Sequence, residues 1–186
     1  MTRSIARVAV CVAALVWMAS PASAQAPTGT SLSASTPALA AVSDQQSCDG
    51  GVATACTNLG SRYAAGNGVV ADVKRAATFY QKGCDGGDVL GCTNLGVAYA
   101  TGDGVVKDLA RAVGLYQKGC DGGDPGACSN LGVLYASGQG VTRDLARAAT
   151  LNQKSCDGGD GFGCANLAVL YAVSYTHLTL PTKRIV

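Results

Sequence analysis

The residues in this sequence that could do chemistry are cysteines, and they recur at a fixed spacing. The tetrapeptide Cys-Asp-Gly-Gly occurs four times at intervals of 36 residues, and a second cysteine follows each first one after eight positions. The first cysteines are Cys48, Cys84, Cys120 and Cys156, and the second ones are Cys56, Cys92, Cys128 and Cys164. Paired cysteines can form structural disulfides, hold a metal ion or act as a redox-active dithiol. A fixed period of this length also indicates a repeat architecture.

The N-terminus bears on these cysteine chemistries, because it predicts export. Residues 1–24 combine Arg3 and Arg7 with an apolar run and a small-residue cleavage site before Gln25, which is typical of a secretory signal. The apolar run is shorter than the roughly 20 residues that a membrane-spanning helix needs. Cleavage removes Cys11 and leaves eight cysteines, an even number that indicates a disulfide framework in an exported protein. We therefore expect a protein of the bacterial periplasm or the medium, with no membrane insertion after cleavage.

The 36-residue symmetry selects one disulfide pattern among the 105 that eight cysteines allow. Each first cysteine pairs with the second cysteine of its own unit, which gives Cys48–Cys56, Cys84–Cys92, Cys120–Cys128 and Cys156–Cys164. A metal site is disfavoured because zinc sites use closer cysteine pairs with histidine nearby, and the single histidine is His177. We predict no bound metal and no cofactor.

The sequence also lacks the common catalytic and ion-binding patterns. The Asp-Gly-Gly-Asp copies match neither an EF-hand nor a calcium-binding nonapeptide repeat, so we expect them to form turns and helix caps. There is no Ser-x-x-Lys, Ser-Asp-Asn or Lys-Thr-Gly motif, no histidine cluster and no glutamate, which argues against a hydrolytic centre. Residues 25–172 hold ten Lys and Arg against twelve Asp, a net charge of −2, so no basic stripe favours nucleic acid. We predict that the protein is not an enzyme and has no nucleic-acid partner.

Each unit is predicted to fold as two short helices joined by tight turns. Four residues of the second unit lie on one helix face because they are spaced i, i+3, i+4 and i+7, namely Cys92, Leu95, Gly96 and Tyr99. A Gly-x-Gly-Val segment then breaks this first helix, and an aspartate is the expected N-cap of the second helix. These aspartates are Asp72, Asp108 and Asp144. The Gly-Gly after each first cysteine ends the second helix and leads into the next unit.

Two residue types recur inside the first helix of the units. A glycine stands in the middle of this helix at Gly60, Gly96 and Gly132, with Ala168 in the fourth unit. Because a mid-helix glycine costs about 1 kcal/mol relative to alanine, its recurrence predicts a close approach between helices. A tyrosine row is expected to fill the space between layers. Its members are Tyr63, Tyr99, Tyr135 and Tyr171.

These residues carry a family resemblance. The pattern Leu-Gly-x-x-Tyr-x-x-Gly-x-Gly-Val-x-x-Asp resembles the Sel1-like repeat (SLR), a relative of the tetratricopeptide repeat, over residues 47–172. The added cysteine pair resembles the secreted cysteine-rich SLR proteins of the Helicobacter type. This resemblance implies an all-α fold, a right-handed superhelical solenoid of helix-turn-helix repeats with one disulfide each. Asn152 replaces the second-helix tyrosine found at Tyr80 and Tyr116, so the later layers are expected to pack slightly differently.

A third row consists of asparagines that stand just before the leucine of each first helix. They are Asn58, Asn94, Asn130 and Asn166. Resemblance to tetratricopeptide repeats implies that the first helices line a concave groove, where an amide could bind the backbone of an extended peptide. The alternative is that the amides bond locally between layers.

We therefore predict a non-catalytic scaffold that binds a protein or peptide partner in this groove. A β-lactam-binding or weakly β-lactamase-like protein, suggested by family resemblance alone, is one alternative. A structural spacer of the envelope is another.

The segments on either side of the repeats are expected to lie outside the solenoid. Residues 25–46 are rich in Ala, Ser, Thr and Pro and are predicted to be a flexible linker. The solenoid, residues 47–172, would hold three full repeats and a truncated fourth. Residues 173–186 break the pattern and resemble the translation of a sequencing adapter joined to the reading frame. We expect this tail to be foreign to the repeat, which would leave the first helix of the fourth unit without its second helix.

Overall fold

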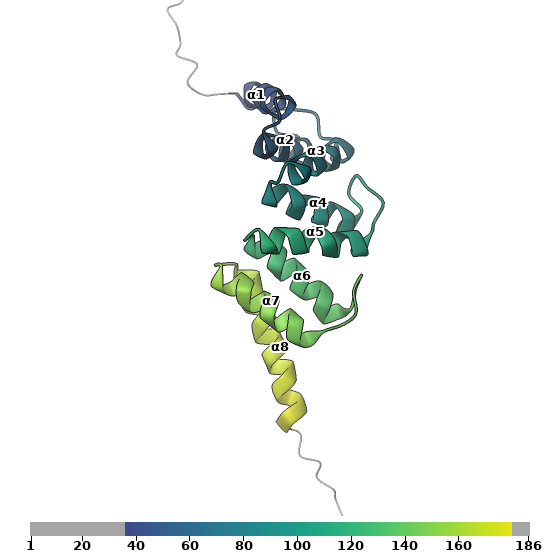
Figure 1. Ribbon diagram of the computed structural model, residues 1–186, viewed down its shortest axis with the longest axis vertical. Helices are drawn as coiled ribbons and strands as arrows, with labels where there is room; N and C mark the ends of the chain where they lie inside the picture. The colour runs from purple at the N-terminus through teal and green to yellow at the C-terminus, as the bar shows by residue number, and fades with distance from the viewer. Residues whose placement is uncertain (1–35, 180–186) are drawn as a thin grey trace, which may run out of the picture. The chain divides into compact units, whose positions relative to one another are not determined.

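The computed structural model describes residues 36–179, and this part of the chain is entirely helical, with eight helices and no strand. They are α1 (Pro37–Asp49), α2 (Ala53–Ala65), α3 (Val73–Asp85), α4 (Val89–Thr101), α5 (Leu109–Asp121), α6 (Pro125–Ser137), α7 (Leu145–Asp157) and α8 (Gly161–Thr179). Consecutive helices pack against each other in chain order (Figure 1). The predicted all-α solenoid is confirmed. The predicted signal sequence, residues 1–24, lies outside the described residues.

The helices are too short to be stable alone. Each helix from α2 to α7 has 13 residues, a length at which an isolated helix is marginal in water. The first helices of the units are α2, α4, α6 and α8, and the second helices are α3, α5 and α7. Since no helix pair can bury its apolar face by itself, stability comes from stacking on the neighbouring units.

The helices begin and end where the sequence predicts. Each N-cap aspartate of a second helix accepts a hydrogen bond from the backbone N–H three residues later, at 2.9–3.0 Å, in Asp72, Asp108 and Asp144. The first helices α2, α4 and α6 end at glycines whose φ angles are 71°, 92° and 72°, namely Gly66, Gly102 and Gly138. This left-handed conformation favours glycine. The predictions for both kinds of helix end are confirmed.

The second glycine of the long turn touches the unit before it. Gly104 has φ of +74°, and a Cβ built on it would overlap the carbonyl oxygen of Val73 at the start of α3. Gly68 and Gly140 approach Pro37 and Leu109 in the same way. Each of these turns is therefore a point where the backbone of one repeat is fitted against the backbone of the previous repeat.

The core repeats with the sequence. One leucine of each first helix is almost completely buried, with exposed fractions of 1%, 2% and 0% for Leu59, Leu95 and Leu131. Burying a leucine side chain contributes roughly 1.5–3 kcal/mol. Alanines of the second helices lie against this column, and Ala112 and Ala148 are fully buried. The small alanine side chains let the helices approach closely enough for the leucines to be enclosed.

The expected close approach at the mid-helix glycines is confirmed. A Cβ built on Gly60 would lie 2.7 Å from the ring of Tyr80, and one on Gly96 would lie 2.8 Å from the ring of Tyr116. The glycine of the first helix therefore receives the tyrosine ring of the second helix in the same unit. Tyr116 is 4% exposed, and burial raises the pKa of its phenol to about 12. In the next unit the amide of Asn152 lies against Gly132 instead.

Replacing Gly96 by alanine should destabilise the protein, although alanine is the better helix former. The added methyl group would collide with the buried Tyr116 ring, and such overpacking costs about 1–3 kcal/mol. Gly114 is the matched control because it lies inside α5 with no atom near its Cβ position. Gly114→Ala should raise the free energy of unfolding by about 0.5–1 kcal/mol. Urea unfolding measures both, and equal effects of the two substitutions would contradict the proposed packing.

The prediction of a flexible linker over residues 25–46 is wrong for the second half of that range. Residues 37–46 belong to α1, which begins at Pro37 with Thr36 as the N-cap. The physical reasons are a proline at the first helical position, alanines with high helix propensity, and packing on α2. Asp44 of α1 forms an ion pair with Arg62 of α2. Residues 25–35 of the predicted linker lie outside the described residues.

The helix α1 has the C-terminal signature of a second helix. In each second helix a glutamine side chain donates to the aspartate four residues later, at 2.7–2.9 Å, as in Gln81–Asp85, Gln117–Asp121 and Gln153–Asp157. Gln45 of α1 donates to Asp49 in the same way, at 2.9 Å. The helix α1 therefore covers α2 as a second helix would, and the repeat begins before residue 47.

The tyrosine row is less buried than predicted. Tyr135 is 7% exposed, Tyr63 and Tyr99 are half-buried, and Tyr171 is 56% exposed. An arginine from the following second helix donates to each of the first three hydroxyls at 3.0–3.2 Å, in the pairs Arg75–Tyr63, Arg111–Tyr99 and Arg147–Tyr135. The guanidinium carbon of each arginine lies 5.2–5.5 Å from the ring centroid, which is cation–π distance. A cation therefore covers the outer side of these rings.

The helix α8 continues beyond the repeat pattern. Its predecessors end at a left-handed glycine, whereas the corresponding position of α8 is Ser174 and the helix runs to Thr179. Without a glycine the chain has no residue suited to the left-handed turn, so helical backbone extends into the predicted tail. Residues 180–186 lie outside the described residues.

Candidate binding face and disulfide joints

Four disulfides join the end of one helix to the next helix. They are Cys48–Cys56, Cys84–Cys92, Cys120–Cys128 and Cys156–Cys164, and their Cα atoms are 4.4–4.6 Å apart. Between the cysteines lies a glycine with positive φ, which reverses the chain; in the first two joints these are Gly51 and Gly87. Each disulfide therefore fixes a sharp turn between a second helix and the first helix that follows it.

The aspartates of the joints accept hydrogen bonds from within the protein. Asp88 accepts from the backbone N–H of Gly91 at 3.1 Å, and Asp124 accepts from the Thr93 hydroxyl of the previous unit at 2.6 Å. Hydrogen bonds from the Ser129 and Ser155 hydroxyls and from backbone N–H groups lower the pKa of Asp160. These carboxylates act as caps between repeats. In the described part of the chain, no three His, Cys, Asp or Glu side chains are grouped to hold a metal ion.

The last disulfide differs from the others in exposure. The six cysteines of the first three joints are 1–7% exposed, whereas Cys156 is half-buried and Cys164 is exposed, because no described helix follows α8. The earlier joints are covered by the helix pair of the following unit. A thiol reagent can therefore reach the fourth disulfide, at Cys164, without any unfolding.

Mild reduction under native conditions should open the Cys156–Cys164 disulfide first. A reducing agent at low concentration, followed by alkylation and peptide mass spectrometry, gives the order in which cysteines are labelled. We expect Cys156 and Cys164 to be labelled while the other three disulfides remain closed, because attack needs access to a sulfur atom. Simultaneous labelling of all eight cysteines would contradict this expectation.

The asparagine-bearing surface of the first helices forms what we term the groove face. The helix α2 contacts α4, and α6 contacts α8, although a second helix separates each pair in sequence. That the first helices line a concave groove, as the resemblance to tetratricopeptide repeats implies, stays a prediction.

The four predicted asparagines occupy equivalent positions on this face. Asn58 is exposed, and the other three, Asn94, Asn130 and Asn166, are half-buried. None of the four amides forms a hydrogen bond with residues 36–172, the residues whose side chains the structure describes. The local interlayer bonds considered as the alternative are therefore not formed in this structure. An amide that is half-buried and unbonded remains available to another molecule.

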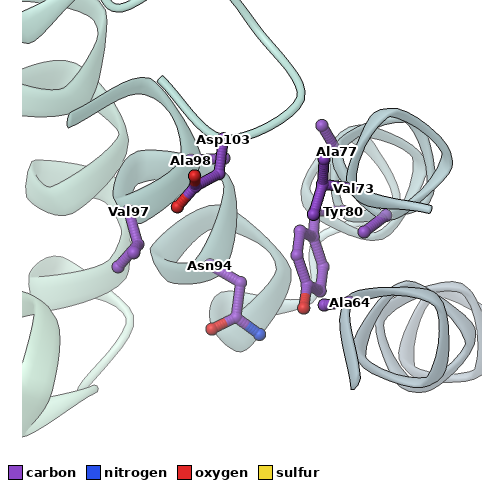
Figure 2. Close-up of a pocket in the computed structure, with 9 residues that line it drawn as sticks. Ala64, Val73, Ala77, Tyr80, Asn94, Val97, Ala98 and Asp103 are labelled. Carbon is purple, nitrogen blue, oxygen red and sulfur yellow. The ribbon is translucent and has the colours of Figure 1, made fainter. Parts of the chain in front are cut away.

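A first cavity lies between α2, α3 and α4. It has a volume of about 240 Å³, and Figure 2 shows Asn94 of α4 on one side of the opening, with Tyr80 of α3 and Ala64 of α2 next to each other on the other side. Val97 and Ala98 complete the wall on α4. The cavity is mainly aliphatic and aromatic, with the Asn94 amide as one of its few polar groups.

A second cavity repeats the first one two units later, between α6, α7 and α8. It has a volume of about 270 Å³. Five of its lining residues stand 72 positions after lining residues of the first cavity, namely Ala136, Asn152, Asn166, Val169 and Leu170. The two cavities are therefore the same structural site in different repeats, and each contains an asparagine of the predicted row.

The size of two residues controls this site. In the first cavity the large Tyr80 faces the small Ala98, and in the second the small Asn152 faces the large Leu170. The unit between them carries Tyr116 and Leu134 at these positions, and both are buried. In each of the two cavities, by contrast, one side chain of the pair is small.

Sequence reasoning missed two features of this surface. It treated Asn152 only as a change in packing, although the structure makes it a wall of the second cavity. It also missed the arginines that cover the tyrosine row. A signal existed in both cases, because Arg75, Arg111 and Arg147 recur every 36 residues and Asn152 stands where two other units have tyrosine.

No helix in the described residues has the length and apolar character to span a membrane.

Comparison with known proteins agrees with this architecture. The Sel1 repeat pattern matches residues 53–88, 89–124 and 125–160. No curated protein matches the chain. Among solved structures, the chain is similar to a protective antigen of uropathogenic Escherichia coli strains that displays an SLR fold, with a TM-score of 0.70 and 33% identity. That match covers 74% of this chain and 29% of the antigen.

Two further structures extend the comparison. A Sel1 repeat protein from Oxalobacter formigenes has a TM-score of 0.64 and 30% identity over 67% of this chain and 51% of its own. The chain thus spans about a third to a half of these two relatives. The Helicobacter pylori cysteine rich protein B has a TM-score of 0.57 and 24% identity, with 69% of this chain and 95% of that chain covered, which shows a shared fold. Because the repeat pattern matches more than half of the residues, the chain belongs to the Sel1 repeat family.

Proposed function

We propose that this protein is an exported scaffold that binds an extended segment of a partner protein along its groove face. Sel1 repeat proteins are in general scaffolds for protein interaction, and their fold is typically non-catalytic. Export and the use of this particular face are the finer parts of the proposal, and they are supported by the disulfides and by the asparagine row.

The unbonded asparagine row is the observation that carries the proposal. Its amides recur once per repeat, they make no hydrogen bond with the described residues, and two of them line apolar cavities. An extended peptide presents a backbone N–H or C=O every few ångströms, and an asparagine amide can both donate to and accept from these groups. A row of amides beside apolar hollows therefore suits a peptide whose backbone is held by hydrogen bonds and whose side chains enter the cavities.

Four disulfides support the exported compartment. Structural disulfides persist in oxidising compartments and are rare in the cytosol, and all four here lie at equivalent joints. A partner would accordingly be met in the periplasm or outside the cell.

Substituting Asn94 and Asn130 together by alanine tests the proposal. A random peptide display library is selected on the unmodified oxidised protein, and the affinities of the selected peptides are measured by fluorescence polarisation. Loss of two hydrogen bonds, each contributing about 0.5–1.5 kcal/mol, should weaken binding by about tenfold or more.

Asn67→Ala is the matched control. Asn67 is exposed in the turn after α2, and its side chain lies outside both cavities. This substitution should leave peptide affinity unchanged. If the double variant binds the selected peptides as well as the unmodified protein does, the groove face is not the binding surface.

A further inference from the structure

We propose that the second cavity, between α6, α7 and α8, is a subsite for the primary carboxamide of a partner's glutamine or asparagine side chain. This inference rests on the proposed function, because it assigns a chemical preference to one position of the groove face. It is carried by the state of Asn152 and by the walls around it.

Asn152 is a buried polar side chain without a partner. It is 1% exposed, its Oδ1 atom is shielded from solvent, and the amide makes no hydrogen bond with the described residues. A buried amide without a partner is rare in native proteins, since the loss of its hydrogen bonds to water is not compensated. The Oδ1 atom lies against Gly132 of α6, so rotation of the side chain toward the cavity would let a bound group supply the missing hydrogen bond.

A second amide lies in the same cavity. Asn166 of α8 is half-buried, is also unbonded within the described residues, and lines the cavity together with Asn152. The two amides offer both donors and acceptors to one small volume. The remaining walls are aliphatic and hydroxyl side chains of α6 and α8, namely Val133, Ala136, Ser137, Val169 and Leu170.

The cavity therefore selects a neutral group that both donates and accepts. None of the described residues that line it is charged, so a carboxylate or ammonium would be buried without a counter-ion, which is strongly unfavourable. A purely aliphatic group would leave Asn152 unbonded. A primary carboxamide pairs with an asparagine amide through one donated and one accepted hydrogen bond, and its methylene stem suits the aliphatic walls. The volume of about 270 Å³ is just below the ~300–1,000 Å³ of small-molecule sites, which fits a single side chain.

The other units show what the residue at position 152 changes. Tyr80 in the first cavity presents an aromatic wall, and the middle unit has Tyr116 and Leu134, both buried, at the corresponding positions. Of the two cavities described, only the second is lined by two unbonded amides, Asn152 and Asn166, whereas the first has Asn94 alone. The preference is therefore expected at one place along the groove face.

Butyramide is the probe, because it carries a primary carboxamide on a short alkyl chain. The oxidised, isotope-labelled protein is titrated with butyramide, and the side-chain NH2 signals are followed by two-dimensional NMR. The signals of Asn152 and Asn166 should shift with saturation. Butyrate, which has the same shape and a negative charge, should bind at least about tenfold more weakly, as expected for the loss of one hydrogen bond or more.

Two variants of Asn152 separate binding from folding. Asn152→Leu has nearly the same shape and removes the amide, so it should raise Tm, keep the cavity and abolish the preference for butyramide over butyrate. Asn152→Tyr recreates the Tyr116 and Leu134 combination of the middle unit, so it should also raise Tm and should fill the cavity. Butyramide shifts that persist in Asn152→Tyr, or equal binding of butyrate, would overturn the subsite.

Peptides selected on the protein give the second readout. Glutamine or asparagine should be enriched at one position, and the enrichment should vanish in selections on Asn152→Leu. Peptides that depend on Asn94 and Asn130 without this enrichment would overturn the subsite and leave the peptide groove standing. Butyramide binding with no dependence of peptides on Asn94 and Asn130 would support the subsite and overturn the groove.

Discussion

Replacing Cys120 and Cys128 by alanine is expected to lower the free energy of unfolding by about 2–5 kcal/mol. Closing a loop of about nine residues stabilises by roughly 2.5 kcal/mol through chain entropy alone. This disulfide is also the most deeply enclosed, with both cysteines 1% exposed in the main core cluster, so the substitution leaves a void as well. Urea unfolding followed by circular dichroism measures the change.

The position of this joint in the stack adds to the effect. Each repeat contacts only its neighbours, so a weakened joint between α5 and α6 separates the described helices into two smaller groups. The same substitution at Cys156 and Cys164 serves as the control, because that joint is less enclosed and lies at the end of the described helices. The substitution at Cys156 and Cys164 should lower the free energy of unfolding by less. Its unfolding transition should also be sharper than that of the Cys120 and Cys128 variant. A larger loss at Cys156 and Cys164 than at Cys120 and Cys128 would contradict this account.

Gly104→Ala is expected to destabilise the protein by about 3 kcal/mol or more. A left-handed φ costs an alanine about 1–2 kcal/mol, and the new methyl group would also overlap the backbone carbonyl of Val73. A backbone atom cannot rotate away as a side chain can, so one repeat would have to move relative to the previous one. Thermal and urea unfolding measure the effect.

Gly87→Ala separates the two contributions. Gly87 has φ of +91°, but no atom lies within 4 Å of its Cβ position. Its substitution should therefore lower the free energy of unfolding by about 1–2 kcal/mol, the contribution of the backbone strain alone. If both glycine substitutions cost the same, the contact with Val73 does not hold the repeats together.

The repeated features of the fold could be predicted because each copy confirms the others. The caps at Asp72, Asp108 and Asp144 and the glycine of each first helix follow from residue chemistry at a 36-residue period. The beginning of the solenoid could not be predicted in the same way. In α1 the composition resembles that of a linker, and its helical state depends on contacts with α2 that composition does not reveal. The exception is Gln45, whose spacing to Asp49 matches the other second helices.

The groove face could be predicted only as a row of residues. The positions of the asparagines follow from the period, but their hydrogen-bonding state depends on how closely the helices approach. The cavities depend on the combined size of residues from neighbouring helices, such as Tyr80 with Ala98. Such combinations are visible only when the register between units is known. The exposure of Tyr171 could not be predicted either, because it depends on which helix follows α8.

The short span of every disulfide has a consequence for how the protein oxidises. Native partners are eight residues apart, whereas Cys56 and the next unit's Cys84 are separated by 28. Since each doubling of loop length costs about 0.6 kcal/mol of closure entropy, the native bridge is favoured over this mispairing by about 1 kcal/mol even in the unfolded chain. Because the chain emerges with its N-terminal end first, both cysteines of one joint are also exposed to oxidation before those of the next joint. Correct pairing therefore follows from the short sequence separation of the native partners. This separation would stay the same in a chain with more repeats, so pairing would not become harder.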